Sequence, residues 1–283
     1  MIIWLASYPK SGNTFVRAFL SAYYFSKNGE FDFSQISKID QFPHEKYFKE
    51  KVNGINEASK QWVPIQKEIN KDRKIRFFKT HSFLGNYQGN QFTSPETTLG
   101  AIYIVRDPRN VLSSLKNHYS FDDNDALKMI KDKTRSLMSN NGSHASLTYI
   151  SSWSENYLSW LRNNQFRRLF IKYEDLITNK YETFRDIIVF TNTLMNKIEG
   201  VNKSKLQKAI ETTNFDVLKK KEVSETFDGS ESSFKNWRKF HSENKNLFFN
   251  LGPDNNWEKI LKTDISKEIE ISFEKEMVEL GYL

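Results

Sequence analysis

The amino-acid sequence predicts an α/β fold, a three-layer sandwich with a central parallel sheet and a P-loop-like loop after the first strand. Short apolar stretches alternate with segments whose apolar residues recur at helical spacing, and turn residues and cations follow three of the apolar stretches. This alternation is typical of a parallel sheet covered on both faces, and such sheets bind ligands at the carboxyl ends of their strands. We therefore expect the functional site in the loops after residues 7, 80 and 106.

The first two elements adjoin a tight loop. Residues 2–7 form an apolar run that ends before Pro9 and Gly12, which predicts a strand. Residues 14–25 carry apolar side chains at helical spacing, which predicts a helix directly after the loop. Strand, loop and helix together form the first unit of the predicted sheet.

The next elements repeat this order. Residues 75–80 are rich in Phe and residues 101–106 form a continuous apolar run, so both segments predict strands. A helix is expected from about Asn110, after the second of these strands. Two helical segments, a strand and a helix follow, at residues 126–138, 146–162, 168–173 and 181–194.

The composition fits one large domain over residues 1–283. The chain has 42 Lys and Arg against 35 Asp and Glu, a net charge of +7, and no Cys. The absence of Cys excludes thiolate catalysis, iron–sulfur clusters and Cys-ligated zinc, and the spacing of the His residues indicates no metal site. The apolar N-terminal run is too short for a secretory signal, and no apolar stretch is long enough to predict a membrane span. We therefore expect a cytoplasmic protein.

The loop over residues 7–14 reads Ser-Tyr-Pro-Lys-Ser-Gly-Asn-Thr. The N-terminus of a helix offers free backbone N–H groups and the positive end of its dipole, so an anion is the natural ligand there. In the nucleotide-hydrolase pattern that takes Gly12 as its second glycine, Asn13 occupies the place of the lysine and only Thr14 is retained. The cation of this loop is Lys10 instead. An ordinary turn between strand and helix is the alternative.

A lysine and a histidine mark the second loop. Lys79 and His81 are two positions apart at the end of a predicted strand, so both can face one cleft. A neutral imidazole can take a proton from a hydroxyl group, and an ammonium group can stabilise negative charge that develops on oxygen. A hydrogen-bonded loop histidine beside a solvated lysine is the alternative.

An arginine and a serine mark the third loop. Arg106 ends a predicted strand and presents a planar fork of N–H donors that suits phosphate oxygens. Ser114 lies eight positions later, in the expected helix, and can add a hydroxyl group. A surface ion pair between Arg106 and Asp107 is the alternative.

These segments together resemble one enzyme family. Residues 8–15, Tyr-Pro-Lys-Ser-Gly-Asn-Thr-Phe, resemble the 5′-phosphosulfate loop of the cytosolic-type sulfotransferases, which use 3′-phosphoadenosine 5′-phosphosulfate (PAPS) as sulfuryl donor. Phe15 stands where that family usually has tryptophan, so an aromatic face that can stack on adenine is kept. Residues 79–81 resemble its Lys-Thr-His segment, and Arg106 with Ser114 matches its 3′-phosphate segment.

The resemblance implies a reaction and a set of site residues. The implied reaction moves a sulfuryl group from PAPS to a hydroxyl or amine of a small molecule or glycan and releases 3′-phosphoadenosine 5′-phosphate (PAP), with no metal and no nucleic-acid partner. His81 is the implied base, Lys10 stabilises the bridging oxygen of the leaving phosphate, and Lys79 assists. The implied donor-binding residues are Lys10, Ser11, Gly12, Asn13, Thr14, Phe15, Arg106, Ser114, Tyr173, Thr213 and Phe215. Core packing is the alternative for the last three of them.

The C-terminal part departs from the family pattern. The family commonly closes its donor site with Arg-Lys-Gly before a tryptophan, but alignment on Trp237 places Ser230 and Glu231 at the basic pair. Candidate replacements are the three lysines at residues 219–221, Lys235 and Arg238. A run of lysines that forms a solvated face is the alternative.

Three other functions stay open. A small-molecule kinase that uses the first loop needs magnesium and a lysine next to Gly12, where this chain has Asn13. A basic nucleic-acid-binding domain needs cations spread over one face. The C-terminal departure also allows a sulfotransferase-like protein that binds the nucleotide without catalysis.

The acceptor cleft is expected to lie under residues 26–74 and 82–100, because insertions after such strands form lids and walls. These segments mix aromatic side chains with many charges. The mixture fits a polar or amphipathic acceptor.

Overall fold

The computed structural model describes residues 1–137, 147–223, 247 and 249–283. Its centre is a five-stranded sheet in which every neighbouring pair of strands is parallel. In spatial order the strands are β2 (Asp40–Gln41), β3 (Arg76–Thr80), β1 (Ile2–Ser7), β6 (Thr98–Val105) and β9 (Arg167–Lys172). The four predicted strands are therefore present, and the short edge strand β2 joins them.

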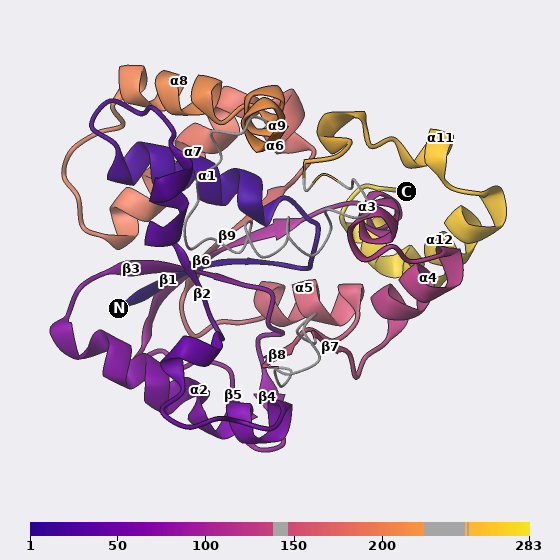
Figure 1. Cartoon of the computed structure of the whole chain (residues 1–283), viewed down its shortest axis with the longest axis horizontal. Helices are drawn as coiled ribbons and strands as arrows, with labels where there is room; N and C mark the ends of the chain where they lie inside the picture. Colours follow the sequence, from indigo (N-terminus) through magenta and orange to yellow (C-terminus); the bar gives the residue numbers. More distant parts are fainter. Residues whose placement is uncertain (138–146, 224–246, 248) are drawn as a thin grey trace.

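Helices cover both faces of this sheet (Figure 1). Because side chains alternate along a strand, Ile3 and Leu5 of β1 join one hydrophobic cluster, whereas Ile2 and Trp4 join the other. The first cluster is completed by α1 (Asn13–Phe25), α6 (Asp175–Thr178), α7 (Lys180–Leu194), α8 (Lys203–Thr212) and α9 (Phe215–Val223). The second is completed by α2 (Ile55–Ile69), α3 (Pro108–Tyr119), α4 (Asp123–Lys131), α5 (Trp153–Leu161) and α12 (Thr263–Glu279). The predicted three-layer α/β sandwich is confirmed.

The helix predicted at residues 126–138 starts and ends earlier, as α4. Asp122 caps its N-terminus by accepting a hydrogen bond from the backbone N–H of Asp125, and the backbone becomes extended at Asp132. The chain then enters β7 (Ser136–Leu137). A local cap and the following extended segment therefore replace the last turns of the predicted helix.

The helix predicted at residues 146–162 is also shorter. Ser152 accepts a hydrogen bond from the backbone N–H of Glu155, and this cap starts α5. Before it lies β8 (Thr148–Tyr149), which pairs antiparallel with β7. Other described elements that were not predicted include α2, α6, α8, α9, α12, the hairpin of β4 (Asn86–Tyr87) and β5 (Asn90–Gln91), and the short α11 (Trp257–Ile260).

A buried ionic cluster fixes the start of α3. The Arg109 guanidinium lies 2.7 Å from the carboxylate of Asp107 and 2.7 Å from that of Glu270 on α12. It also donates to the carbonyl oxygen of Tyr282 at 2.9 Å and lies 3.9 Å from the ring centre of Trp257. The C-terminal helix and the last residues of the chain are thereby packed against α3 (Figure 1).

The strand order brings the three candidate loops together. Because β1 lies between β3 and β6 and all three run parallel, their carboxyl ends share one edge of the sheet. The loops that follow residues 7, 80 and 105 therefore lie side by side, as predicted. Within the described ranges, no helix has both the length and the apolar composition that crossing a membrane requires.

Candidate active site

The loop between β1 and α1 has the shape of an anion site. Lys10 and Gly12 take left-handed backbone angles, with φ of 66° and 99°, so the chain turns sharply before α1 begins. A Cβ on Gly12 would lie 2.4 Å from Cδ2 of Tyr173, so a larger residue does not fit beneath that ring. The N–H groups of the first turn of α1 follow directly, at the positive end of the helix dipole. This geometry suits the anion predicted here.

Lys10, in the loop after β1, lies close enough to Lys79 of β3 for their charges to interact. Desolvation and the charge of the Arg106 guanidinium lower the pKa of Lys10 to about 7, and Glu222 opposes this shift. Desolvation, followed by the charges of Arg17 and Lys10, lowers the pKa of Lys79 to about 7. The Lys10 charge makes the charged form of Lys79 less favourable, and the Arg106 charge does the same to Lys10, so cations gather here in a way that a bound anion would relieve.

His81 lies between these lysines and the end of β1. Desolvation and the charges of Lys79 and Lys10 hold the pKa of His81 well below its usual range, so the imidazole is neutral at pH 7. Its Nδ1 lies 2.7 Å from the carbonyl oxygen of Ser7. A carbonyl oxygen only accepts hydrogen bonds, so the proton lies on Nδ1 and Nε2 keeps its lone pair. His81 is therefore a neutral imidazole in a defined tautomer.

Three residues that no sequence pattern marked support this arrangement. Gln41 of β2 accepts a hydrogen bond from Nζ of Lys79 at 3.3 Å. Lys79 is therefore held by the protein and is not the solvated lysine considered as the alternative. Asn156 of α5 donates to the carbonyl oxygen of His81 at 3.0 Å. Ser7 contributes a backbone carbonyl, for which a sequence carries no signal. The pairing of β2 with β3 brings Gln41 to the site, and α5 brings Asn156.

Arg106 joins the third loop to the first. Its Nη1 donates to the carbonyl oxygen of Lys10 at 3.0 Å, and its Nη2 donates to that of Gly252 at 3.4 Å. The guanidinium carbon lies 4.0 Å from the ring centre of Tyr173, which also covers Gly12. Arg106 and Tyr173 therefore both contact the loop between β1 and α1.

The surface ion pair considered for Arg106 is wrong. Asp107 pairs with Arg109 instead, and Arg106 is only 5% exposed. Its Nε and the hydroxyl of Ser11 are both buried, and neither has a hydrogen-bond partner among the described residues. Two buried donors at one loop are consistent with a ligand that accepts hydrogen bonds.

The remaining predicted donor-binding residues take different places. Ser114 is half-buried in the second turn of α3. Phe215 packs on Gly252, since a Cβ on Gly252 would lie 2.2 Å from Cε2 of Phe215. The carbonyl oxygen of Gly252 is the one that accepts the hydrogen bond from Arg106. Thr14 lies in the first turn of α1.

Two predicted residues make interior contacts. Phe15 is 7% exposed and its ring lies edge-on to Phe184 of α7, with ring centres 5.3 Å apart. Thr213 is buried at the end of α8 and its hydroxyl donates to the carbonyl oxygen of Ala209 at 2.7 Å. The structure thus places both side chains in the layer that packs on the sheet, and their contact with adenine stays a prediction.

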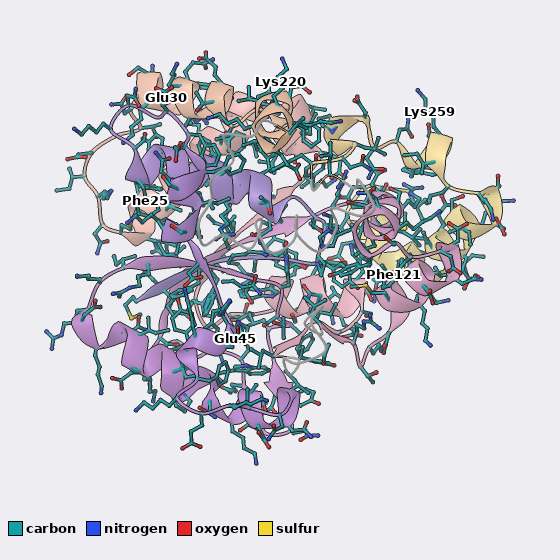
Figure 2. The ribbon with its side chains drawn as sticks, in the orientation of Figure 1. Phe25, Glu30, Glu45, Phe121, Lys220 and Lys259 are labelled. Carbon is teal, nitrogen blue, oxygen red and sulfur yellow. The ribbon has the colours of Figure 1, made fainter. Side chains whose placement is uncertain are left out.

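The C-terminal departure lies largely outside the described residues. Trp237, Ser230, Glu231, Lys235 and Arg238 all lie there. The three lysines at residues 219–221 belong to the described part of the chain. Lys219 donates to the carbonyl oxygen of residue 250, and Lys221 donates to that of residue 31. The middle one, Lys220, extends away from the molecule (Figure 2).

No group of three or more His, Asp or Glu side chains able to hold a metal ion occurs in the part of the chain that the structure describes. The candidate site offers lysine, arginine and a neutral histidine near the N-terminus of α1. Such a set can bind a multiply charged anion, stabilise a leaving oxygen and accept one proton.

Solved structures of other proteins resemble this chain in fold. The crystal structure of mouse sulfotransferase SULT7A1 complexed with PAP is 19% identical, with a TM-score of 0.56, and the match covers 97% of this chain and 83% of that chain. Retinol dehydratase in complex with androsterone and inactive cofactor PAP is 16% identical, with a TM-score of 0.60 and coverage of 98% and 80%. The same enzyme in a complex with retinol and PAP is 14% identical, with a TM-score of 0.58 and coverage of 98% and 81%.

These structures share the fold of this chain. A comparison with curated proteins gave no match. The family model of the sulfotransferase domain matches residues 2–281, nearly the full length. The chain therefore belongs to the sulfotransferase family.

Proposed function

We propose that the protein transfers a sulfuryl group from PAPS to a hydroxyl or amine acceptor. The observation that carries the proposal is the meeting of Lys10, Lys79 and Arg106 with the neutral His81 at the carboxyl ends of three adjacent strands. An excess of buried positive charge beside a base fits a reaction that combines a polyanionic donor with deprotonation of an acceptor. The solved relatives complexed with PAP support the choice of donor.

The residues present fit PAPS. The hydroxyl of Ser11 and Nε of Arg106 are buried donors that no described residue satisfies, and both are suited to anionic oxygens. The loop over residues 10–14 would hold the 5′-phosphosulfate, and Arg106 with Ser114 would hold the 3′-phosphate. Tyr173, Thr213, Phe215 and Phe15 would surround adenine. When bound, PAPS supplies the sulfuryl group and leaves as PAP.

The proton of the acceptor would go to His81. The Ser7 carbonyl occupies Nδ1, so Nε2 is the nitrogen that can accept it. Because desolvation and the nearby lysines keep the pKa of His81 low, the ring is in its basic form at neutral pH without prior deprotonation. The imidazolium formed is unfavourable beside two lysines, unless the negative charge of the donor offsets them.

The two lysines would manage negative charge. Lys10, in the phosphate loop, would stabilise the bridging oxygen as the sulfur–oxygen bond breaks, and Lys79 would assist from β3. Both have a pKa of about 7 in the free protein, so a bound anion would favour their charged forms.

The acceptor would be a small molecule or glycan with a free hydroxyl or amine. The side of the site that follows His81 carries the half-buried rings of Phe83, Tyr87 and Tyr149, with ring centres 5.0 to 5.6 Å apart. The solved structures of retinol dehydratase contain androsterone and retinol. The aromatic rings would give an acceptor an apolar wall. A cytoplasmic location stays a prediction.

The decisive experiment combines PAP binding with transfer. The purified chain is incubated with PAPS carrying a labelled sulfuryl group and with panels of phenols, alcohols, amines and oligosaccharides, while PAP binding is followed by thermal shift. We expect PAP to raise the melting temperature and at least one acceptor to become labelled without added magnesium.

Each other outcome has a defined meaning. No thermal shift at millimolar PAP would overturn the donor assignment. Binding without labelling of any acceptor would indicate the nucleotide-binding protein that has lost activity. Magnesium-dependent turnover of ATP would indicate a kinase, and nucleic-acid binding that weakens steeply with salt would indicate a basic binding domain.

A further inference from the structure

Asn13 links the phosphate loop to the strand before it. As the first residue of α1, it is 4% exposed. Its Nδ2 donates to the carbonyl oxygen of Leu5 at 2.9 Å and to the hydroxyl oxygen of Ser7 at 3.2 Å. Both amide hydrogens are thus used inside the protein, so the position that carries the phosphate-binding lysine in the nucleotide-hydrolase pattern serves a different purpose here.

Ser7 is also the residue that touches His81. The Nδ1 of His81 lies 2.7 Å from the Ser7 carbonyl oxygen and 3.3 Å from the Ser7 hydroxyl oxygen. The contacts from Asn13 to Ser7 and from Ser7 to His81 therefore form one continuous path from the buried start of α1 to the half-buried imidazole.

A second contact holds the backbone of His81 but leaves its ring free. Nδ2 of Asn156 donates to the carbonyl oxygens of His81 and Ile150, at 3.0 and 2.7 Å, and its Oδ1 accepts from the hydroxyl of Tyr103 at 2.7 Å. None of these bonds involves the imidazole. The orientation and tautomer of the ring are therefore set on the Ser7 side.

From these contacts we propose that Asn13, acting through Ser7, is a positioning residue for His81: it holds in place the carbonyl that fixes the proton on Nδ1 and so presents Nε2 to the acceptor. The role of Nε2 as a base rests on the proposed function, but the effect of Asn13 on the tautomer does not. A histidine that rotated or changed tautomer would offer an N–H where a lone pair is needed.

The tautomer can be measured without any substrate. Nitrogen-15 correlation spectra of the imidazole rings distinguish the Nδ1–H form from the Nε2–H form, and His81→Asn assigns the signal. We expect wild-type His81 in the Nδ1–H form and Asn13→Ala with a clearly increased Nε2–H population. Ser7→Ala removes the hydroxyl through which Asn13 reaches Ser7 and keeps the carbonyl, so a change in the same direction is expected.

A matched control comes from the same helix. Ser21 of α1 is buried and its hydroxyl has no partner among the described residues, so Ser21→Ala should leave the His81 spectrum unchanged. If the spectrum of Asn13→Ala, in a folded protein, is the same as that of the wild type, the proposal is overturned. Should Asn13→Ala fail to fold, Ser7→Ala decides in its place.

Kinetics test the consequence. We expect Asn13→Ala to lower kcat by about 10-fold, a part of what a general base contributes. The KM for the donor should change less than about 2-fold, because residue 13 would meet the donor through its backbone N–H, which alanine keeps. In the His81→Asn background the same substitution should have no further effect on kcat. An equal loss in both backgrounds, or a parallel loss of PAP affinity, would show that Asn13 merely shapes the loop. If no acceptor is found, the spectra still decide the positioning role.

Discussion

At the scale of single residues, the site is defined by cations that destabilise one another. The pKa values of Lys10 and Lys79 fall to about 7, and the pKa of His81 lies well below its usual range, because desolvation and the charges of neighbouring cations act on all three. Such a cluster is unfavourable in the free protein and becomes favourable once a polyanion is bound. The residues that cost the fold stability are therefore those that would recognise the donor.

Replacing His81 tests the base. His81→Asn should lower kcat by roughly 10²- to 10⁴-fold, because the acceptor would keep its proton at the start of attack. PAP affinity should stay within a few-fold of the wild type, since the imidazole is neutral and carries no charge for the donor. Transfer assays and calorimetry with PAP measure the two quantities. Unchanged turnover would remove His81 from the mechanism.

Replacing Lys10 tests the charge at the leaving oxygen. Lys10→Ala should lower kcat by about 10²- to 10³-fold, similar to loss of an electrostatic donor at an oxyanion. The matched control is Lys220→Ala, which removes an equal charge from an exposed side chain (Figure 2). Equal losses from both substitutions would indicate a general effect of net charge.

The pH dependence of PAP binding follows from the two lysines. In the free protein both lysines have a pKa of about 7, and a bound anion would stabilise their protonated forms. Protons are therefore taken up on binding, and affinity should fall as pH rises from about 6 to 9. Calorimetry in buffers of different ionisation enthalpy measures both the affinity and the proton uptake. His81→Asn should keep this dependence, and affinity that rises with pH would contradict the assignment.

At the scale of elements, α3 depends on the C-terminal part of the chain. Arg109 is 6% exposed at its side chain and contacts Asp107, Glu270 and the carbonyl of Tyr282, so it ties α12 to the start of the helix that bears Ser114. The Tyr282 hydroxyl also donates to Glu174 at 2.9 Å, next to Tyr173. The last residues of the chain thus support the segments expected to hold the 3′-phosphate.

Breaking this cluster should destabilise the whole protein. Arg109→Ala leaves the Asp107 carboxylate buried without its partner, which costs on the order of 3–5 kcal/mol of unfolding free energy. Arg185→Ala breaks an exposed ion pair with Glu182, which water and salt screen, so it should leave the unfolding free energy nearly unchanged. Urea unfolding of both variants gives the comparison. Similar small losses would show that the cluster does not anchor α3.

At the scale of the whole molecule, the same lysines link stability to pH. Between about pH 7 and 9 the unfolded chain keeps both lysines protonated, whereas the folded protein releases protons from Lys10 and Lys79. The unfolded state then binds more protons, so the contribution of these two groups to stability rises with pH in this range.

Melting curves test this linkage. The rise between pH 7 and 9 should be reduced in a Lys10→Met, Lys79→Met double variant and by saturating PAP, which holds both lysines in their charged forms. A rise of equal size in the double variant would assign it to other groups.

Much of the fold and part of the site were predictable. Strong apolar runs marked β1, β3, β6 and β9, and their shared parallel direction placed the three loops at one edge. The starts of α4 and α5 could not be predicted from the apolar spacing, because the caps formed by Asp122 and Ser152 decide where these helices begin.

The sequence by itself determined the sheet, the loop that suits an anion, and the side chains of Lys10, Lys79, His81 and Arg106, because each follows from the order of residues along one segment. Only the tertiary structure decided which nitrogen of His81 carries the proton, where Arg106 points and how the lysines lose their ordinary pKa. Those properties arise from backbone carbonyls, from burial and from charges on distant segments, and such neighbours exist only after the chain has folded.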